Sequence, residues 1–584
     1  MNGIKKIQEY LSQNNYDAYV IFSSDDHGSE YIDDYFKMRD YFSGFTGSNG
    51  TMVITKTDSY VWTDGRYFIQ AKEQLKKTGT ILMKMDEKGY PTIYEFIASL
   101  GIEPVICFDY KIATINFVSY VLLKNSKVKF VNESLLIDKI WTDRPQKVKS
   151  KAYLLPDNAA GENIGDKITR VKEKILKKGY KNLLITSLDD IAWLFNMRGN
   201  DIKYNPVNYA YALITSEQTT LYIDLTKLNS QDVSVLSKNN VVIKNYEDIY
   251  SDVKNIDGKV LIDARSTNYM LYANIKNKDM VTVSPICELK AIKNPTEIKN
   301  IKKAHIEDAV AMIKFHKYLK ENVGKIYMDE LTLENILLNF RKENPDFTDL
   351  SFDTICGYES NGAIIHYSAT PETNKIVKNK GFLLVDSGAQ YNFGTTDITR
   401  TYALGEITKE MKKHYTLVLK SHIALSDAIF IEGTTGANLD MLSRECLYRE
   451  FIEFKHGTGH GVGYFLNVHE GPQNISIRNK TNVYPMCEGM VTSDEPGIYI
   501  ENNYGIRLEN LILCKKIKSN DYGNFYGFEP LTLVPFDIDA IDVDMLTDVE
   551  KTWINNYNKL IKENVSCYLD EDLKNYLNEI TKQL

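Results

Sequence analysis

The stretch GFLLVDSGAQYNFGTTDITRTY, residues 381–402, decides the fold of the C-terminal half of the chain. An apolar run leads into a turn and a threonine-rich run returns from it, which is the pattern of a β-hairpin. A turn centred on Tyr391 and Asn392 would place Asp386 opposite Asp397. Because like charges opposite each other across a hairpin repel, the pattern predicts a cation between these two carboxylates.

The stretch VTSDEPGIYIENNYGIRLENLIL, residues 491–513, repeats the arrangement. Glu495 lies seven residues before Asn502 and Glu509 lies seven residues after it, so a turn at Asn502 and Asn503 would hold a second carboxylate pair across a second hairpin. One such pair could be an exposed coincidence. Two pairs within otherwise apolar strands predict a shared site for two divalent cations, because an unpaired buried carboxylate is costly.

A fifth ligand is predicted from the glycine-rich stretch KHGTGHGVGYFLNVHEGP, residues 455–472. His456 and His460 have the spacing of a helical zinc motif, but the surrounding glycines favour a loop over a helix. In such a loop His460 would supply one imidazole, with His456 and His469 nearby for hydrogen bonding or proton transfer. For each histidine taken alone, a surface or hydrogen-bonded role is the alternative. Four carboxylates and one imidazole suit Mn²⁺, with Co²⁺, Fe²⁺ or Zn²⁺ as alternatives.

The composition excludes several classes of protein. The chain has 584 residues, of which 43% are hydrophobic and 25% charged, as in ordinary globular proteins of several domains. Its net charge of −8 provides no basic field for nucleic acid. No uncharged apolar stretch approaches the roughly 18 to 20 residues of a membrane span. The seven cysteines include no CxxC pair, which favours a reducing compartment, so we expect a cytoplasmic protein. The net charge and the lack of a long apolar stretch predict no nucleic-acid or membrane partner.

Between residues 15 and 290 the sequence passes twice through one pattern, which predicts two related domains. Nine residues separate Thr55 from Asp64 in the first pass and Thr215 from Asp224 in the second. The other matching segments are apolar runs that end in aspartate, namely 17–26 with 182–190 and 105–109 with 259–263. Strands that alternate with helical stretches predict that both domains are α/β, with chance similarity as the alternative.

A boundary near residue 290 precedes a change of pattern. Asn294, Pro295 and Glu297 form a helix start, with an N-cap, a proline at the first helical position and an acid at the third. Apolar residues then recur at helical spacing to about residue 320. Other helical patterns cover 162–178, 329–342, 408–429 and 437–454. Strand alternation between the later helices predicts a third domain of the α+β class, with helices on an antiparallel sheet.

The candidate ligands carry a resemblance to a known family. The ordered set lies in the contexts VDSGAQY, TTDITRTY, HGTGHGVG, SDEPGIY and GIRLEN and comprises Asp386, Asp397, His460, Glu495 and Glu509. It resembles the metal-binding set of the pita-bread metallopeptidases, and within them it is most similar to the aminopeptidases P, or Xaa-Pro aminopeptidases. Further similar segments are SGFTGSNGT (43–51), WTDGRYF (62–68), RGNDIKYNPV (198–207), NGAIIHY (361–367) and FEPLTLVPFD (528–537).

The resemblance implies a domain organisation and an activity. It implies two creatinase-like α/β domains (1–145 and 146–290), a pita-bread catalytic domain (291–527) and a C-terminal extension (528–584) like that of the long cytosolic type. It also implies an aminopeptidase that releases the first residue from peptides with proline in second position. A hydroxide that bridges two divalent ions, expected to be Mn²⁺, would attack the scissile carbonyl.

The resemblance also assigns roles to single residues. All five residues of the set would be metal ligands, and Glu495 would also be the general base. His366 and His469 would flank the scissile bond and stabilise the developing oxyanion, while His456 would line the substrate site. Arg507, together with Tyr499, would neutralise the carboxylate cluster, with a surface cation as the alternative for Arg507.

Two other functions remain as alternatives at this point. A prolidase cleaves Xaa-Pro dipeptides with the same metal site, but its usual chain has one N-terminal domain rather than two. Some pita-bread proteins have lost their metals and act as binding modules, but here the ligand set is complete. The tail, residues 537–584, has a helical pattern that includes Trp553 and Tyr557 and lies beyond the last ligand. We expect a homodimer, with a tail folded onto its own subunit as the alternative.

Overall fold

The structure, a computed structural model, describes residues 2–478 and 484–584. Two compact units divide it. Unit 1 comprises the chain up to residue 156 together with 162–286, and unit 2 comprises 157–161 and 287–584. Among the described residues no helix has both the length and the apolar character needed to cross a lipid bilayer.

Unit 1 contains the predicted duplication. Its first sheet has the strand order β4-β3-β2-β1-β5-β6 and its second the order β12-β11-β10-β8-β13-β14. The strands of the first sheet are β1 (Ala18–Phe22), β2 (Thr51–Thr55), β3 (Ser59–Thr63), β4 (Ile81–Lys84), β5 (Val105–Phe108) and β6 (Lys129–Asn132). Those of the second are β8 (Asn182–Ile185), β10 (Ala210–Ile214), β11 (Thr219–Ile223), β12 (Val241–Lys244), β13 (Val260–Asp263) and β14 (Lys278–Val281).

The two sheets also agree in strand direction. In each, one antiparallel meander (β1, β2 and β3; β8, β10 and β11) carries parallel strands on both sides. The aspartates of the sequence repeat occupy equivalent places, because Asp64 follows β3 and Asp224 follows β11. Identical order and direction in two sheets of one chain confirm the predicted pair of related α/β domains.

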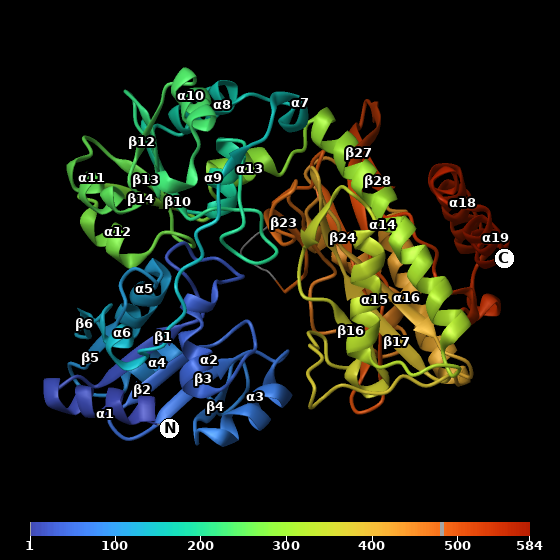
Figure 1. Ribbon diagram of the computed structural model, residues 1–584, viewed down its shortest axis with the longest axis horizontal. Helices are drawn as coiled ribbons and strands as arrows, with labels where there is room; N and C mark the ends of the chain where they lie inside the picture. Colours follow the sequence, from blue (N-terminus) through green and yellow to red (C-terminus); the bar gives the residue numbers. More distant parts are fainter. Residues whose placement is uncertain (1, 479–483) are drawn as a thin grey trace. The chain divides into compact units, whose positions relative to one another are not determined.

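Helices cover these sheets (Figure 1). In the first half they are α1 (Asn2–Asn14), α2 (Met38–Ser43), α3 (Phe68–Gln74), α4 (Ile93–Ala98), α5 (Ile115–Lys124) and α6 (Leu136–Ile140), and in the second half α8 (Ile164–Lys177), α9 (Leu188–Leu194), α10 (Ser230–Lys238), α11 (Ile249–Asp252) and α12 (Tyr269–Asn274). The helix predicted over 162–178 is α8, where Ile164, Ile168, Val171 and Ile175 are buried at helical spacing and Asn163 caps the first turn.

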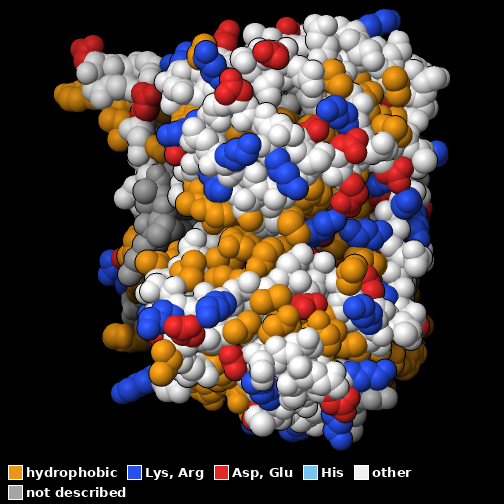
Figure 2. Space-filling model, turned by 90° about the vertical axis from the view of Figure 1, so that its left-hand side faces the viewer, with side chains coloured by type: hydrophobic (Ala, Val, Ile, Leu, Met, Phe, Trp, Pro, Cys, Tyr) orange, Lys and Arg blue, Asp and Glu red, His pale blue; other side chains and the backbone are white. Residues whose placement is uncertain are grey.

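Apolar side chains gather across the middle of the unit 1 face that Figure 2 shows. Aromatic rings contribute to the junction between the two halves of the unit. Tyr110 of the first half packs edge-on against Tyr269 of α12 at 4.9 Å between ring centroids, and Tyr269 stacks on Tyr272 at 6.0 Å. These contacts bury part of the apolar surface that each sheet would otherwise expose.

Unit 2 is the predicted α+β domain, and its strands pair antiparallel throughout the described residues. The largest sheet has the order β21-β28-β27-β24-β22-β23. Its strands are β21 (Phe430–Ile431), β22 (Gly459–Gly461), β23 (Glu470–Ile475), β24 (Val491–Asp494), β27 (Asn510–Asn520) and β28 (Gly523–Pro530). Smaller sheets join β16 (Ile355–Tyr358), β17 (Phe382–Ser387) and β20 (Ile398–Ala403), and β15 (Phe347–Leu350), β18 (Ala389–Tyr391) and β19 (Gly394–Thr395). A hairpin joins β25 (Gly497–Ile500) and β26 (Tyr504–Arg507).

Long helices cover unit 2 (Figure 1). They are α14 (Pro295–Asn322), α15 (Glu330–Lys342), α16 (Lys409–Ser426), α17 (Gly436–Tyr448), α18 (Asp548–Val565) and α19 (Glu571–Ile580), after the short α13 (Pro285–Lys290). The first four of these long helices pack against the strands, and the last two pack on α14 and α16. The helix start predicted near residue 294 is confirmed, because Asn294 and Glu297 form a reciprocal capping box. The helix predicted to run to 454 ends at Tyr448 instead. Phe451, three residues later, has a φ of 59°, which a helix does not accommodate.

The C-terminal tail packs on unit 2 itself. Tyr557, Ile561 and Val565 of α18 and Leu577 of α19 belong to the same apolar core as α14 and α16. Ile561 has no exposed surface. The apolar face of the tail that motivated the predicted dimer is therefore covered within its own chain.

Candidate metal centre

The first hairpin brings Asp386 and Asp397 to one face, but not in the predicted register. Asp386 lies opposite Thr399, and the turn falls at Asn392 and Phe393, one residue later than predicted. Phe393 takes a φ of 70° there. A turn displaced by one residue shifts the pairing by two, and a shift of two leaves every side chain on its face. Asp397 is thus a diagonal neighbour of Asp386 rather than its direct partner.

The second hairpin has the predicted register. Strands β25 and β26 pair symmetrically about Asn502, and β24 and β27 continue this register with Asp494 opposite Asn510. Glu495 directly follows β24 and Glu509 directly precedes β27. The two glutamates therefore lie across from each other, in the short gap between the two ladders.

The predicted ligands converge. Nε2 of His460 lies 3.5 Å from Oδ2 of Asp397 and 3.6 Å from Oε1 of Glu495. Side-chain ligand atoms of Asp397, His460 and Glu509 lie within 4.8 Å of one another. Asp386 is close enough for its charge to raise the pKa of Asp397, after the larger effect of burial. Five residues from separate strands thus form one cluster.

Burial and mutual repulsion shift the acidity of this cluster. Burial, and then the charge of Asp386, raise the pKa of Asp397 well above its ordinary value. Burial, followed by the neighbouring aspartates, raises the pKa of Glu509 in the same direction. Burial raises the pKa of Glu495 to about 7, although His460 and Arg507 oppose the shift. These carboxylates resist ionisation together unless a cation joins them.

The hydrogen bond of His460 fixes which ring nitrogen carries the proton. Its Nδ1 lies 3.0 Å from the carbonyl oxygen of Gly461, which can only accept a hydrogen bond. Nδ1 therefore carries the proton, and Nε2 presents a lone pair toward Asp397 and Glu495. Backbone bonding of one nitrogen is the usual way in which a metal-binding histidine is oriented.

Arg507 joins the cluster to Tyr499 and His456. Its Nη2 donates to Oδ2 of Asp386 at 2.6 Å, and its Nη1 donates to the Tyr499 hydroxyl at 2.7 Å. Nδ1 of His456 faces the carbonyl oxygen of Gly457 at 2.7 Å, so Nε2 accepts from Tyr499 at 2.9 Å. Burial and the charge of Arg507 lower the pKa of His456 to about 3. Arg507 is buried, so the surface alternative is wrong.

The two histidines predicted to flank the scissile bond lie on different segments. The ring of His469 lies 4.3 Å from the ring of His460, at an interplanar angle of 82°. His366 is half-buried in the irregular segment after β16, and its charge contributes to the lowered pKa of His456, behind burial and Arg507. His469 is therefore beside the ligand cluster, and His366 lies near His456.

Two hydroxyl side chains that contact ligands were missed by the sequence reasoning. Thr399 donates to Oε2 of Glu509 at 2.7 Å and accepts from Nε of Arg507 at 3.2 Å. Ser493 donates to Oε1 of Glu495 at 3.3 Å. Each lies two residues from a predicted ligand and so on the same strand face, which is a signal that could have identified them.

A second layer of buried polar groups supports the residues next to the ligands. Nδ1 of His422 lies 3.2 Å from Oδ2 of Asp494, and Asn510 donates to Nε2 of His422 at 3.2 Å. Arg400 donates to Oδ1 of Asn510 at 2.7 Å. Asp494 and Asn510 are the chain neighbours of Glu495 and Glu509. Their partners are distant in sequence, so no local pattern indicated this network.

The donor set fits divalent metal ions. Four carboxylates face one guanidinium, so negative charge is in excess. Oδ1 of Asp386 is buried and accepts no hydrogen bond from the described residues. A buried carboxylate oxygen without a donor is costly unless a cation approaches it. Oxygen-rich ligands with one imidazole are typical of sites for hard or borderline divalent cations.

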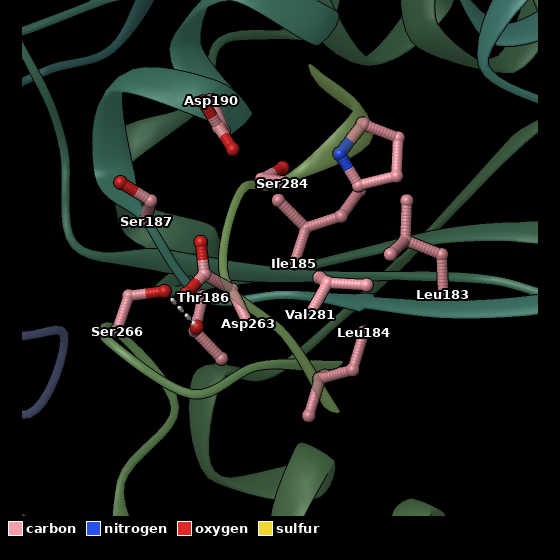
Figure 3. A pocket seen from close by; sticks show the side chains of 11 residues that line it. Leu183, Leu184, Ile185, Thr186, Ser187, Asp190, Asp263, Ser266, Val281 and Ser284 are labelled. Atoms are coloured by element: carbon pink, nitrogen blue, oxygen red, sulfur yellow. Dashed lines mark hydrogen bonds between the residues drawn. The ribbon is translucent and has the colours of Figure 1, made fainter. Parts of the chain in front are cut away.

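A cavity in the second half of unit 1 is too small to compete as a functional site. It lies at the ends of β8 and β13, where Asp190, Asp263 and Ser284 surround it (Figure 3). Thr186 and Ser266 hydrogen-bond each other at 2.8 Å in its wall. Its volume of about 10 Å³ suits about one water molecule, whereas ligand pockets usually exceed about 300 Å³.

Family models cover most of the chain. Models described as creatinase/prolidase N-terminal domain match residues 4–140 and 143–297. The model of metallopeptidase family M24 matches residues 299–516, and the C-terminal region of this family matches 524–584. All five candidate ligands fall within the M24 match.

Individual relatives are similar over nearly the full length. A probable Xaa-Pro aminopeptidase P of Neurospora crassa is 38% identical, over 97% of this chain and 86% of the relative. Aminopeptidase P2 of Arabidopsis thaliana is 37% identical over 95% of this chain and 84% of its own. The crystal structure of an X-prolyl aminopeptidase from Caenorhabditis elegans, described as a cytosolic enzyme with a di-nuclear active site, has a TM-score of 0.92 and 33% identity, covering 97% of this chain and 95% of that chain. Prolidase from Pyrococcus furiosus reaches a TM-score of 0.50 and 25% identity and covers 62% of this chain and 98% of its own.

Proposed function

Because the chain belongs to the aminopeptidase P group of metallopeptidase family M24, we propose that it releases the N-terminal residue from peptides whose second residue is proline. The observation that carries the proposal is the convergence of Asp386, Asp397, His460, Glu495 and Glu509 at the meeting point of two hairpins. A binding module without catalysis would have no use for this complete set.

The five converging side chains would hold two divalent ions, which when bound polarise the scissile carbonyl and lower the pKa of water. Mn²⁺ is the ion we propose, since the ligands are four carboxylates and one imidazole. Glu495 would accept the proton of the attacking water, a role supported by its position 3.6 Å from Nε2 of His460 and by its pKa, which burial raises to about 7. Arg507 holds Asp386 in place and offsets part of the negative charge.

The histidines supply the hydrogen bonds of the reaction. His469, beside His460, and His366 on the irregular segment would donate to the scissile carbonyl oxygen as negative charge develops on it. His456 stays neutral at physiological pH, because burial lowers its pKa to about 3. It would therefore line the substrate site as a neutral ring, held by its bonds to Gly457 and Tyr499, rather than as a cation.

Proline specificity follows from what such a site does not require. A prolyl bond is a tertiary amide without an N–H, so a site that must hold that N–H would reject it. Attack by a water molecule activated at the carboxylate cluster needs the carbonyl group of the scissile bond and not its N–H. The excess of negative charge would also attract the free α-ammonium group of a short peptide.

A set of four short peptides tests this function. The metal-loaded protein should cleave Arg-Pro-Pro after arginine, should refuse its N-acetylated form and should cleave Arg-Ala-Pro far more slowly. An Xaa-Pro dipeptide is the fourth substrate. A strong preference for the dipeptide would assign the protein to prolidase activity, the alternative that the family relationships do not favour.

Localisation and assembly are further proposals. A cytoplasmic location is supported by the cytosolic enzyme of Caenorhabditis elegans and by the seven cysteines, all in the described part of the chain, which are free thiols. We retain the homodimer as a proposal, although its interface cannot use the tail's buried apolar face. Light scattering that returned a mass near 67.0 kDa at micromolar concentration would contradict it.

The domain division at 145, 290 and 527 is also proposed. It is supported by the limits of the family models, which change near residues 140, 297 and 520. Limited proteolysis tests this division. The first cuts should fall near these three boundaries, and the fragments should keep their secondary structure.

A further inference from the structure

Glu470, the residue that follows His469 in the sequence, is held by two buried lysines from a distant segment. Nζ of Lys293 donates to Oε1 of Glu470 at 2.7 Å, and Nζ of Lys290 lies 2.8 Å from Oε2. Each of these side chains is 1% exposed. Two ammonium groups therefore hold one buried carboxylate, one at each of its oxygens.

The lysines belong to a rigid segment of unit 2. Lys290 ends α13, and Lys293 directly precedes Asn294, which caps α14. The backbone N–H of Lys293 donates to the carbonyl oxygen of Gly489 at 3.0 Å, and its Nζ also donates to the carbonyl oxygen of Lys290 at 3.1 Å. This segment is thus fixed at both its backbone and its side chains.

Glu470 lies at an interruption of the β22–β23 ladder. Gly461 pairs with Glu470, but the preceding residue, His460, pairs with Asn474. Residues 471–473 therefore bulge out of the β22–β23 ladder, so regular hydrogen bonds do not continue past this point. His469 lies two residues before the bulge, and its ring must stay 4.3 Å from that of His460.

We propose that Lys290, Lys293 and Glu470, hereafter the lysine clamp, are positioning residues for His469. By holding the Glu470 carboxylate from both sides, the two lysines fix the orientation of the residue before it, next to a ladder that is interrupted. The inference rests on the proposed role of His469 at the scissile bond. It also gives a functional reason for the sequence ELKAIKN (288–294), which helix capping alone does not explain.

The first test removes one arm of the clamp. Lys293→Met leaves a neutral Lys290–Glu470 pair and a side chain of similar length. We expect kcat to fall between about 10-fold and 100-fold, since small misplacements of a group at a reaction centre have effects of this size. KM for the tripeptide and metal content should stay near those of the natural protein, and Lys293→Arg should recover part of kcat. Lys290→Met removes the other arm and serves if Lys293→Met does not fold.

The matched control is Lys420→Met. Lys420 pairs with Glu550 at 2.7 Å between α16 and α18, with side chains 19% and 17% exposed, and it contacts none of the site residues named above. Its loss should lower stability and leave kcat unchanged. An equal loss of kcat in this control would show that ion-pair removal in unit 2 acts through general destabilisation, and would overturn the clamp.

A double variant distinguishes a failure of the lysine clamp from a failure of the proposed role of His469. With His469 already replaced by alanine, Lys293→Met should cause no further loss of kcat, because the clamp acts through that imidazole. A further loss of the same size as in the natural protein, or no loss from Lys293→Met alone, would overturn the clamp while leaving the role of His469 intact. Full activity of His469→Ala would instead remove the proposed role of His469, and the clamp with it.

Discussion

Nη2 of Arg507 lies 2.6 Å from Oδ2 of Asp386, across a separation of 121 residues in the sequence. This ion pair joins the strand that carries the first ligand to the strand that leads to the last. It is a single guanidinium among four carboxylates, so it cannot balance them when all four are ionised.

Removing a ligand should remove metal and activity together. We expect Asp397→Asn and Glu509→Gln to lower the metal content. The rate of peptide cleavage should fall by about 100-fold or more, since water activation is lost. Metal analysis by mass spectrometry after gel filtration measures the first quantity. Glu550→Gln, a change of the same kind far along the chain in α18, is the control. Two equivalents of metal in either ligand variant would contradict the ligand assignment.

The metal-free protein should lose stability as the pH rises. Burial raises the pKa of Glu495 from 4.5 to about 7 in the folded chain. The folded state therefore binds more protons than the unfolded state between these values, and the free energy of unfolding falls across this window. Relative to Glu495→Gln, the natural protein should lose on the order of 3 kcal/mol between pH 4.5 and pH 8.

Urea denaturation of the metal-free proteins at several pH values measures this difference. Saturating Mn²⁺ should reverse the slope, because the metal binds the ionised carboxylates of the folded state only. A difference between the two metal-free proteins that stays constant with pH would contradict the raised pKa of Glu495.

The flanking histidines should affect rate without affecting metal. His366→Ala and His469→Ala should each lower kcat by about 100-fold or more, since a donor to the developing oxyanion is lost. Metal content should match that of the natural protein, because neither residue belongs to the converging ligand set. If either variant loses a metal equivalent, that histidine is a ligand and the role given to it here is wrong.

The two hairpins show how far the sequence could predict the site. The register about Asn502 could be read from the symmetric positions of Glu495 and Glu509, and it is confirmed. The first register was wrong by two residues, because turn residues alone did not distinguish a turn at Tyr391 from one at Phe393. The candidate ligands were still identified correctly as a cluster, since the pleat repeats every two residues.

Contacts between distant segments could not be predicted. Arg400 donates to the backbone of Val534 and to Asn510, and Lys293 reaches Glu470 across 177 residues. Such pairs depend on how the sheets and helices pack, and the periodicity of a local segment does not indicate this packing. The end of α17 at Tyr448 was missed for a related reason, because the backbone conformation of Phe451 is set by its surroundings rather than by its helix propensity.

The tail should stabilise its own subunit. Ile561→Ala in α18 should lower the free energy of unfolding by about 2 to 5 kcal/mol, because it opens a cavity in the core of unit 2. Lys559→Ala, two residues earlier with a side chain 73% exposed, should change it by less than about 0.5 kcal/mol. The loss should be the same at all protein concentrations. A loss that shrank as concentration rose would place the tail in an interface between subunits.

The ratio of kcat/KM for Arg-Pro-Pro to that for Arg-Ala-Pro, measured on the Mn²⁺-loaded protein, is the sharpest test of the proposed activity. We expect rapid release of arginine from the proline peptide, little release from the alanine peptide, and slower cleavage of the dipeptide Arg-Pro than of the tripeptide. Equal values of kcat/KM for the proline and alanine peptides would contradict it.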